Sequence, residues 1–132
     1  MLAWLFAEPA SAAVETYLTN ASDLIASELT PVECDRAIHQ AVARGGIVEA
    51  RAQNLHRDLA ISQKAWEIVP LLPSVLERAR QAFPGEPIRT LDALHVASAL
   101  RARAAYPQLV ILSLDPRIRL VAANLGFSLL PV

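Results

Sequence analysis

The chain has little of what disulfide-linked, thiolate-zinc and membrane proteins require. Its 132 residues include one cysteine, Cys34, so neither an internal disulfide nor a zinc site built from thiolates can form. No apolar run approaches the roughly 18 residues of a membrane-spanning helix. The apolar start, residues 1–6, lacks the basic first part of a signal peptide and is too short to be one. We therefore expect a cytoplasmic protein that does not enter a membrane.

A strong charge of either sign is also missing. The formal net charge is −1, and the cations are eleven arginines and a single lysine. Without an overall attraction to polyanions, any nucleic-acid site must be a local patch. Arginine suits paired contacts with phosphate, although genome composition explains such a bias at least as well. A chain that is 54% hydrophobic is not disordered, and its length predicts a single domain over residues 1–132.

Short apolar runs alternate with amphipathic stretches along the chain, which predicts an α/β fold with a mainly parallel sheet. We expect strands at 24–29, 66–71, 109–114 and 127–132. We expect helices at 9–18, 30–44, 47–63, 74–83, 91–105 and 116–124. Thr30 and Glu33 have the spacing of a capping box, and Thr90 and Asp115 are expected to cap the two later helices.

Three acids, Glu33, Asp92 and Asp115, follow predicted strands or begin predicted helices. Each has an ordinary explanation, because carboxylates cap helices and favour the first turn. Parallel strands, however, would gather these acids at one end of the sheet, where ligand sites of α/β proteins lie. Three carboxylates repel one another unless a cation lies between them. Their hard oxygen atoms suit Mg²⁺ or Mn²⁺, which proteins commonly use in phosphoryl chemistry.

Three segments also carry a resemblance to a known family. They are residues 26–33 with Arg36, residues 91–97, and residues 112–115 followed by Ala122 and Gly126. In order and spacing they resemble the PIN-domain ribonucleases, specifically the VapC-type toxins of prokaryotic toxin–antitoxin pairs. The resemblance covers nearly the whole chain. It implies a three-layer α/β/α fold, a Mg²⁺- or Mn²⁺-dependent endoribonuclease that cleaves RNA, a cognate antitoxin protein and a homodimer.

By position in that family, Glu33, Asp92 and Asp115 resemble catalytic acids that bind the metal, and Ser113 resembles the hydroxyl that accompanies the last one. The family opens with a strand carrying a further Asp, just before a segment like residues 2–9. That strand is not in the sequence, so we expect an N-terminally truncated domain whose first strand is missing. The alternative is a catalytically impaired PIN-like binding module that acts through antitoxin or dimer contacts.

Other residues leave two interpretations open. Arg36, Arg89 and Arg117 each lie near an acid in sequence and either neutralise it or hold an RNA phosphate. His95, one helical turn after Asp92, is either a packed side chain or a general base. A phosphatase-like enzyme or a DNA-directed nuclease would use the same acids.

Overall fold

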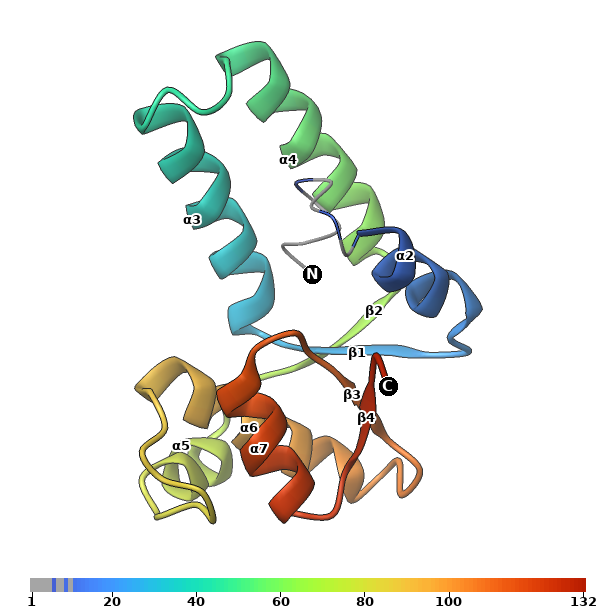
Figure 1. The fold of residues 1–132 in the computed structure, drawn as a ribbon, viewed down its shortest axis with the longest axis vertical. Coiled ribbons are helices and arrows are strands. Elements are labelled where there is room, and N and C mark those ends of the chain that lie inside the picture. The colour runs from blue at the N-terminus through green and yellow to red at the C-terminus, as the bar shows by residue number, and fades with distance from the viewer. Residues whose placement is uncertain (1–5, 7–8, 10) are drawn as a thin grey trace. The chain divides into compact units, whose positions relative to one another are not determined.

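A computed structural model describes residues 6, 9 and 11–132 as helices that alternate with short strands (Figure 1). This alternation confirms the predicted α/β class. The elements are α2 (Ser11–Asn20), β1 (Leu24–Ser27), α3 (Leu29–Ala43), α4 (Glu49–Gln63), β2 (Trp66–Val69), α5 (Pro73–Ala79), α6 (Thr90–Arg103), β3 (Val110–Leu112), α7 (Pro116–Asn124) and β4 (Ser128–Leu130). The expected features of residues 1–5, 7, 8 and 10 lie outside the described residues.

The chain forms two compact units, Met1–Glu67 (unit one) and Ile68–Val132 (unit two), and each is described by itself. Strand β1 pairs with β2, within which the chain passes from unit one to unit two. Strand β3 pairs with β4 in parallel, with Ile111 opposite Leu129, in agreement with the predicted mainly parallel sheet. In the part of the chain that is described, no helix is long and apolar enough to cross a membrane.

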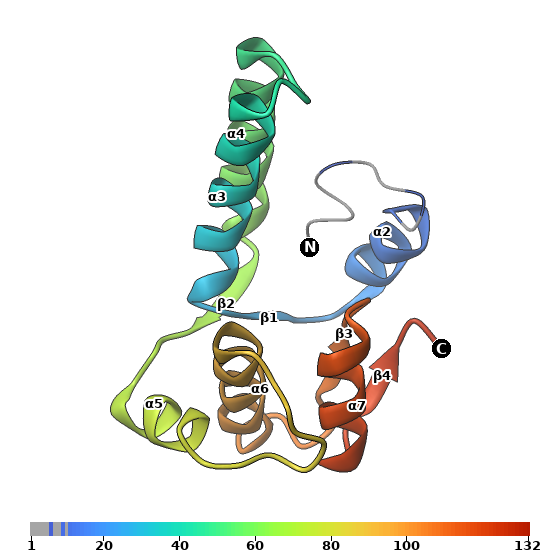
Figure 2. The ribbon, with the colours of Figure 1, turned by 60° about the vertical axis from the view of Figure 1, so that its left-hand side comes forward.

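Unit one contains a hairpin of two 15-residue helices, α3 and α4, which lie side by side (Figures 1 and 2). Apolar residues recur at helical spacing on both helices and form one buried cluster, which consists of Cys34, Ile38, Ala52, Leu55 and Leu59. Across the hairpin, Nδ1 of His56 lies 2.8 Å from Oδ1 of Asp35. Burial of the cluster holds the two helices together, because isolated helices of this length are marginal in water.

Replacing Ile38 with alanine is expected to lower the free energy of unfolding by about 2–5 kcal/mol, since the side chain is 0% exposed and its removal leaves a cavity. The matched control is Ile61→Ala on α4, where the side chain is 59% exposed and the expected change is within about 0.5 kcal/mol. Urea unfolding of the three proteins measures both differences. Equal losses for the two variants would contradict the packing of the hairpin.

Unit two is arranged around α6, which contacts both α5 and α7. Its core is a second buried cluster, which consists of Val75, Phe83, Ala93, Val96, Ala97 and Val121. The loop between α5 and α6 is closed by Glu86, whose carboxylate accepts hydrogen bonds from the backbone N–H groups of Phe83 and Ile88. This packing fixes the N-terminal end of α6, where Asp92 lies.

Two predicted helix caps, Thr30 and Thr90, are wrong. Helix α3 begins at Leu29, so Thr30 lies inside the first turn and forms no capping box with Glu33. The buried Ser27 accounts for the shift, because its Oγ accepts a hydrogen bond from the N–H of Leu29 at 3.3 Å. Helix α6 begins at Thr90, and Arg89 occupies the cap position without a side-chain cap bond.

Candidate active site

Asp92 lies in the first turn of α6, and its side chain is half-buried. Its Oδ2 atom is fully buried and has no hydrogen-bond partner within the described residues. Burial raises the pKa of the Asp92 carboxyl, and the charge of Asp115 raises it further. The charges of Arg89, His95 and Arg117 lower the same pKa. Asp92 therefore lies in an environment that penalises its ionised form, close to several other ionisable groups.

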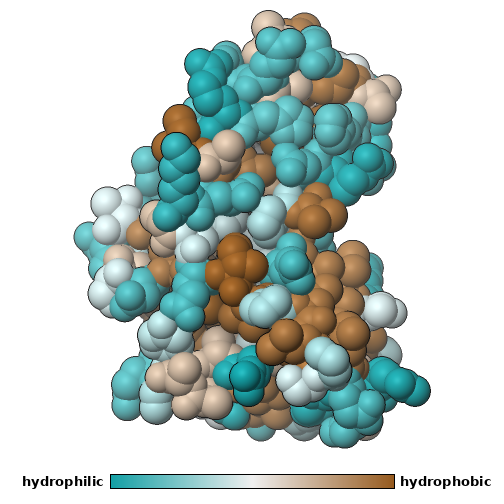
Figure 3. Space-filling model, turned by 180° about the vertical axis from the view of Figure 1, so that it is seen from behind, coloured by the Kyte–Doolittle hydropathy of each residue, from teal (hydrophilic) through white to brown (hydrophobic). Residues whose placement is uncertain are grey.

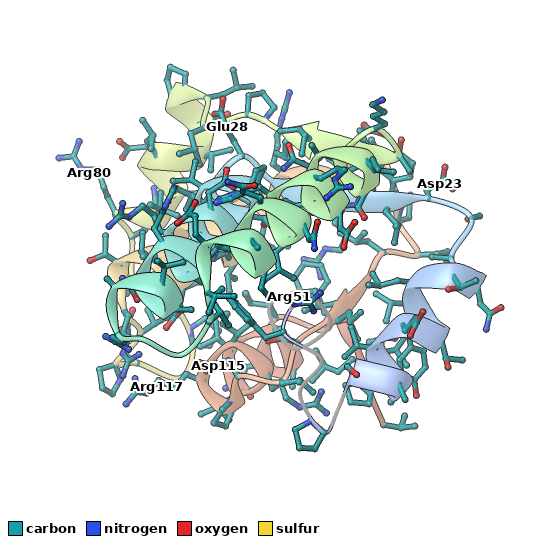
Figure 4. The ribbon with its side chains drawn as sticks, turned by 90° about the horizontal axis from the view of Figure 1, so that it is seen from above. Asp23, Glu28, Arg51, Arg80, Asp115 and Arg117 are labelled. Atoms are coloured by element: carbon teal, nitrogen blue, oxygen red, sulfur yellow. The ribbon has the colours of Figure 1, made fainter. Side chains whose placement is uncertain are left out.

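Asp115 is the N-cap of α7, as the sequence predicts. Its Oδ1 atom accepts hydrogen bonds from the backbone N–H groups of Arg117 at 2.7 Å and Ile118 at 3.3 Å. Pro116 follows at the first helical position, where the missing N–H costs nothing. Figure 4 labels Asp115 and Arg117 at this end of α7. The cap uses Oδ1 alone, so it does not engage the second carboxylate oxygen.

Ser113 supports the backbone of Asp115. Its Oγ atom accepts a hydrogen bond from the N–H of Asp115 at 3.2 Å. A serine or threonine that binds the N–H two residues later stabilises a turn of this kind. Ser113 is therefore a neighbour of the acid in contact as well as in sequence, and its role as a metal ligand stays a prediction.

Two of the three predicted acids come together in unit two. After burial, Asp115 is the largest cause of the raised pKa of Asp92, so the two carboxylates are close enough to repel each other. Arg89 and Arg117, two arginines expected near the acids, act on the same carboxylate. Their proximity to the pair agrees with both roles considered for them, neutralisation and phosphate binding.

The third predicted acid, Glu33, lies on α3 in unit one, as does Arg36. A joint site of Glu33 with Asp92 and Asp115 therefore stays a prediction. Within the described residues, no three His, Cys, Asp or Glu side chains are grouped so that they could hold a metal ion.

One residue near the site was missed by the sequence analysis. Arg119 lies four residues after Asp115 on α7 and donates hydrogen bonds to the backbone carbonyl oxygens of Ser113, Leu130 and Pro131. The four-residue spacing from Asp115 was the available signal, but that spacing suggests an ion pair along the helix instead. The carbonyl groups are brought to Arg119 by the tertiary fold.

The pair fits a divalent cation by its donor chemistry. Carboxylate oxygens are the preferred ligands of Mg²⁺ and Mn²⁺. A buried carboxylate oxygen without a donor, such as Oδ2 of Asp92, is costly unless a cation or a water molecule on that cation satisfies it. A cation would also offset the repulsion between Asp92 and Asp115.

Two neighbouring carboxylates at the starts of two helices of an α/β protein offer the oxygen donors that a divalent cation prefers. The sequence model of the PIN domain matches residues 1–124, so the chain belongs to the PIN domain family. PIN domains have a three-layer α/β/α fold, are generally nucleases that act on RNA or DNA, and usually use divalent metals. A comparison with curated proteins finds no match.

Proposed function

We propose that this protein is a Mg²⁺- or Mn²⁺-dependent endoribonuclease toxin of the VapC type, neutralised by a cognate antitoxin protein. The observation that carries the proposal is the carboxylate pair in unit two, in which Asp92 keeps a buried oxygen without a donor beside the charge of Asp115. Membership of the PIN domain family supports the nuclease class. RNA as substrate, the toxin role and the antitoxin rest on the resemblance of the three sequence segments.

Asp92 and Asp115 would hold the metal, and we propose Glu33 and Ser113 as its further ligands. When bound, such a metal supplies an activated water and stabilises charge on the scissile phosphate. The start of α7 keeps one oxygen of Asp115 in place and leaves the other for this task. Arg89 and Arg117, whose charges act on Asp92, are proposed to hold the RNA backbone through its phosphates.

The proposed protein partners are the antitoxin and a second copy of this chain. Apolar side chains gather on the surface of unit two (Figure 3). Three of its large exposed apolar residues, Leu72, Leu76 and Leu91, lie at or near the starts of α5 and α6. Exposed apolar area of this kind favours association with another protein.

The second candidate function is a catalytically impaired PIN-like module that acts through its antitoxin or dimer contacts. It applies if Glu33, which lies on α3 in unit one, takes no part in the site and Asp92 and Asp115 are its only acids. A single carboxylate pair gives a divalent ion fewer protein ligands than three acids do. This candidate predicts a folded chain that binds protein partners and cleaves no RNA.

Cleavage of a pool of labelled RNA by the 132-residue chain separates the candidates. The enzyme predicts fragments in the presence of Mn²⁺, none with EDTA, and recovery when Mn²⁺ is restored. A single-stranded DNA of the same sequence serves as the second substrate, and cleavage of DNA alone would replace the ribonuclease by a DNA-directed nuclease. A folded chain that cleaves neither substrate would favour the binding module.

Replacing Glu33 with glutamine tests whether the third acid belongs to the site. If Glu33 is a ligand, the cleavage rate at limiting Mn²⁺ is expected to fall by at least about tenfold, because loss even of a group that supports a ligand has effects of this size. The matched control is Glu49→Gln in the first turn of α4, where the rate should stay unchanged. An unchanged rate for Glu33→Gln would restrict the site to Asp92 and Asp115.

A further inference from the structure

The side chain of Arg119 joins the ends of the parallel strands β3 and β4 by hydrogen bonds to backbone carbonyl groups. We call this set of hydrogen bonds the clasp. The Nη1 atom of Arg119 donates to the carbonyl oxygen of Ser113 at 2.9 Å and to that of Leu130 at 3.1 Å, and its Nη2 atom donates to that of Pro131 at 2.9 Å. The N–H of Ser113 also donates to the carbonyl oxygen of Leu130 at 3.1 Å. One half-buried guanidinium thus joins the segment after β3 to the segment after β4.

The segment held by Arg119 is the one that carries Asp115. Ser113 is fixed through its carbonyl by Arg119, and its Oγ atom in turn accepts from the N–H of Asp115. The N–H of Arg119 donates to the backbone carbonyl of Asp115 at 3.0 Å. The backbone before the acid is therefore held by the side chain of Arg119, and the carbonyl of the acid itself by the backbone N–H of the same residue.

The hydrogen bonds of Arg119 run to carbonyl groups, which distinguishes it from the other arginines near the pair. Arg89 and Arg117 act on Asp92 through their charge. All three hydrogen bonds of the Arg119 side chain end on neutral carbonyl oxygens, so Arg119 affects the acids through the position of the backbone. Guanidinium can bridge three carbonyls because it carries five N–H donors in a rigid plane, whereas the ammonium group of lysine is a compact point charge.

We propose that Arg119 is a positioning residue that sets the Asp115 carboxylate for its metal by clasping the ends of β3 and β4. This inference rests on the proposed function, since it concerns the same acid. It also assigns a role in the site to residues 130 and 131, whose carbonyl groups complete the clasp. Groups that orient metal ligands typically change metal affinity or activity 10- to 100-fold when they are lost.

The test compares Arg119→Met and Arg119→Lys with the matched control Arg101→Met, an arginine in the last turn of α6. Three measurements are made: the Mn²⁺ dissociation constant by electron paramagnetic resonance, RNA cleavage at limiting and saturating Mn²⁺, and hydrogen exchange of the backbone amides of Arg117 and Ile118. Arg119→Met is expected to weaken Mn²⁺ binding about 10- to 100-fold and to speed exchange of both amides. Arg119→Lys should recover part of each loss, and Arg101→Met should match the wild type.

The Asp115→Asn background shows whether the effect runs through the acid. If Arg119 acts by positioning Asp115, Arg119→Met should weaken residual Mn²⁺ binding far less in that background than in the wild type. Equal weakening in both backgrounds, or a folded Arg119→Met with wild-type Mn²⁺ affinity and amide exchange, would overturn the proposal. Loss of cooperative unfolding in both Arg119 variants would overturn it too, because Arg119 would then be a general requirement of unit two.

Failure of the proposed function gives a different result. If the wild-type chain neither binds Mn²⁺ nor cleaves RNA, the proposed metal site is ruled out. The exchange of the Arg117 and Ile118 amides still reports whether Arg119 fixes the start of α7. Slow exchange in the wild type and fast exchange in Arg119→Met would then retain the clasp and remove its link to metal.

Discussion

Replacing Asp92 or Asp115 with asparagine is expected to lower the rate of RNA cleavage by about 10²- to 10⁴-fold, the range typical for loss of an essential electrostatic or proton-transferring group. Asparagine keeps the size of the side chain and removes the negative charge that would bind the metal. Because asparagine is also a good N-cap, Asp115→Asn should keep the start of α7. A folded and inactive Asp115→Asn therefore separates the chemical role of the acid from its capping role.

Two further variants complete this experiment. Asp115→Ala should lose the same activity and also lower the free energy of unfolding by about 1 kcal/mol, because it removes the cap. Asp58→Asn on the exposed side of α4 is the matched control and should cleave at the wild-type rate. Wild-type cleavage by Asp92→Asn would contradict the proposed site, since the buried carboxylate would then take no part in the reaction.

The second large expected effect is that Mn²⁺ reverses which of two proteins, the wild type or Asp92→Asn, is the more stable. Burial and the charge of Asp115 raise the pKa of the Asp92 carboxyl above its ordinary value of 3.8. Between the ordinary and the raised pKa, the folded chain binds more protons at Asp92 than the unfolded chain does. The stability of the metal-free protein therefore falls as pH rises through this window, and the loss persists at neutral pH. Asp92→Asn should remove this penalty.

Without metal at neutral pH, Asp92→Asn is expected to be more stable than the wild type, because asparagine lacks the charge that burial and Asp115 disfavour. Mn²⁺ at 100 times its dissociation constant should stabilise the wild type by about 2.7 kcal/mol and leave the variant nearly unchanged. In Mn²⁺ the wild type is then the more stable of the two proteins. Urea unfolding with EDTA and with Mn²⁺ measures this, with Asp58→Asn as the control that follows the wild type in both.

If the same protein were the more stable one in both EDTA and Mn²⁺, the proposed metal site would be contradicted. If the wild type gained nothing from Mn²⁺, the carboxylate pair would bind no metal. If Asp92→Asn were less stable than the wild type in EDTA, the Asp92 carboxylate would have partners that offset its burial. Each result can be distinguished from loss of fold, because both proteins must first unfold cooperatively.

The local signals in the sequence predicted much of the fold. Asp115 followed by Pro116 is a strong helix start, and the cap forms as expected, because both residues act on backbone groups within one turn. The start of α3 was misplaced because Thr30 and Glu33 suggested a cap, whereas the hydroxyl of Ser27 binds the N–H of Leu29 first. Two plausible caps three residues apart differ by contacts that the sequence does not contain.

The site was predictable where it depends on residues near one another in sequence. Asp92 and Asp115 were singled out because each accompanies the start of a helix, and Ser113 was singled out through the family resemblance. Arg119 was missed because its three partners come from two separate segments, and their convergence depends on the pairing of β3 with β4. The relation of Glu33 to the pair depends in the same way on how distant parts of the chain come together.

The most direct test of the central claim is the anomalous diffraction of a crystal of this chain soaked in Mn²⁺. We expect a peak within coordination distance, about 2.0–2.3 Å, of carboxylate oxygens of both Asp92 and Asp115. The same map shows whether Glu33 or Ser113 reaches the ion. The contradicting result is a crystal that holds Mn²⁺ elsewhere and shows no peak at Asp92 and Asp115 while Oδ2 of Asp92 is still buried. These two acids would then not form the metal site.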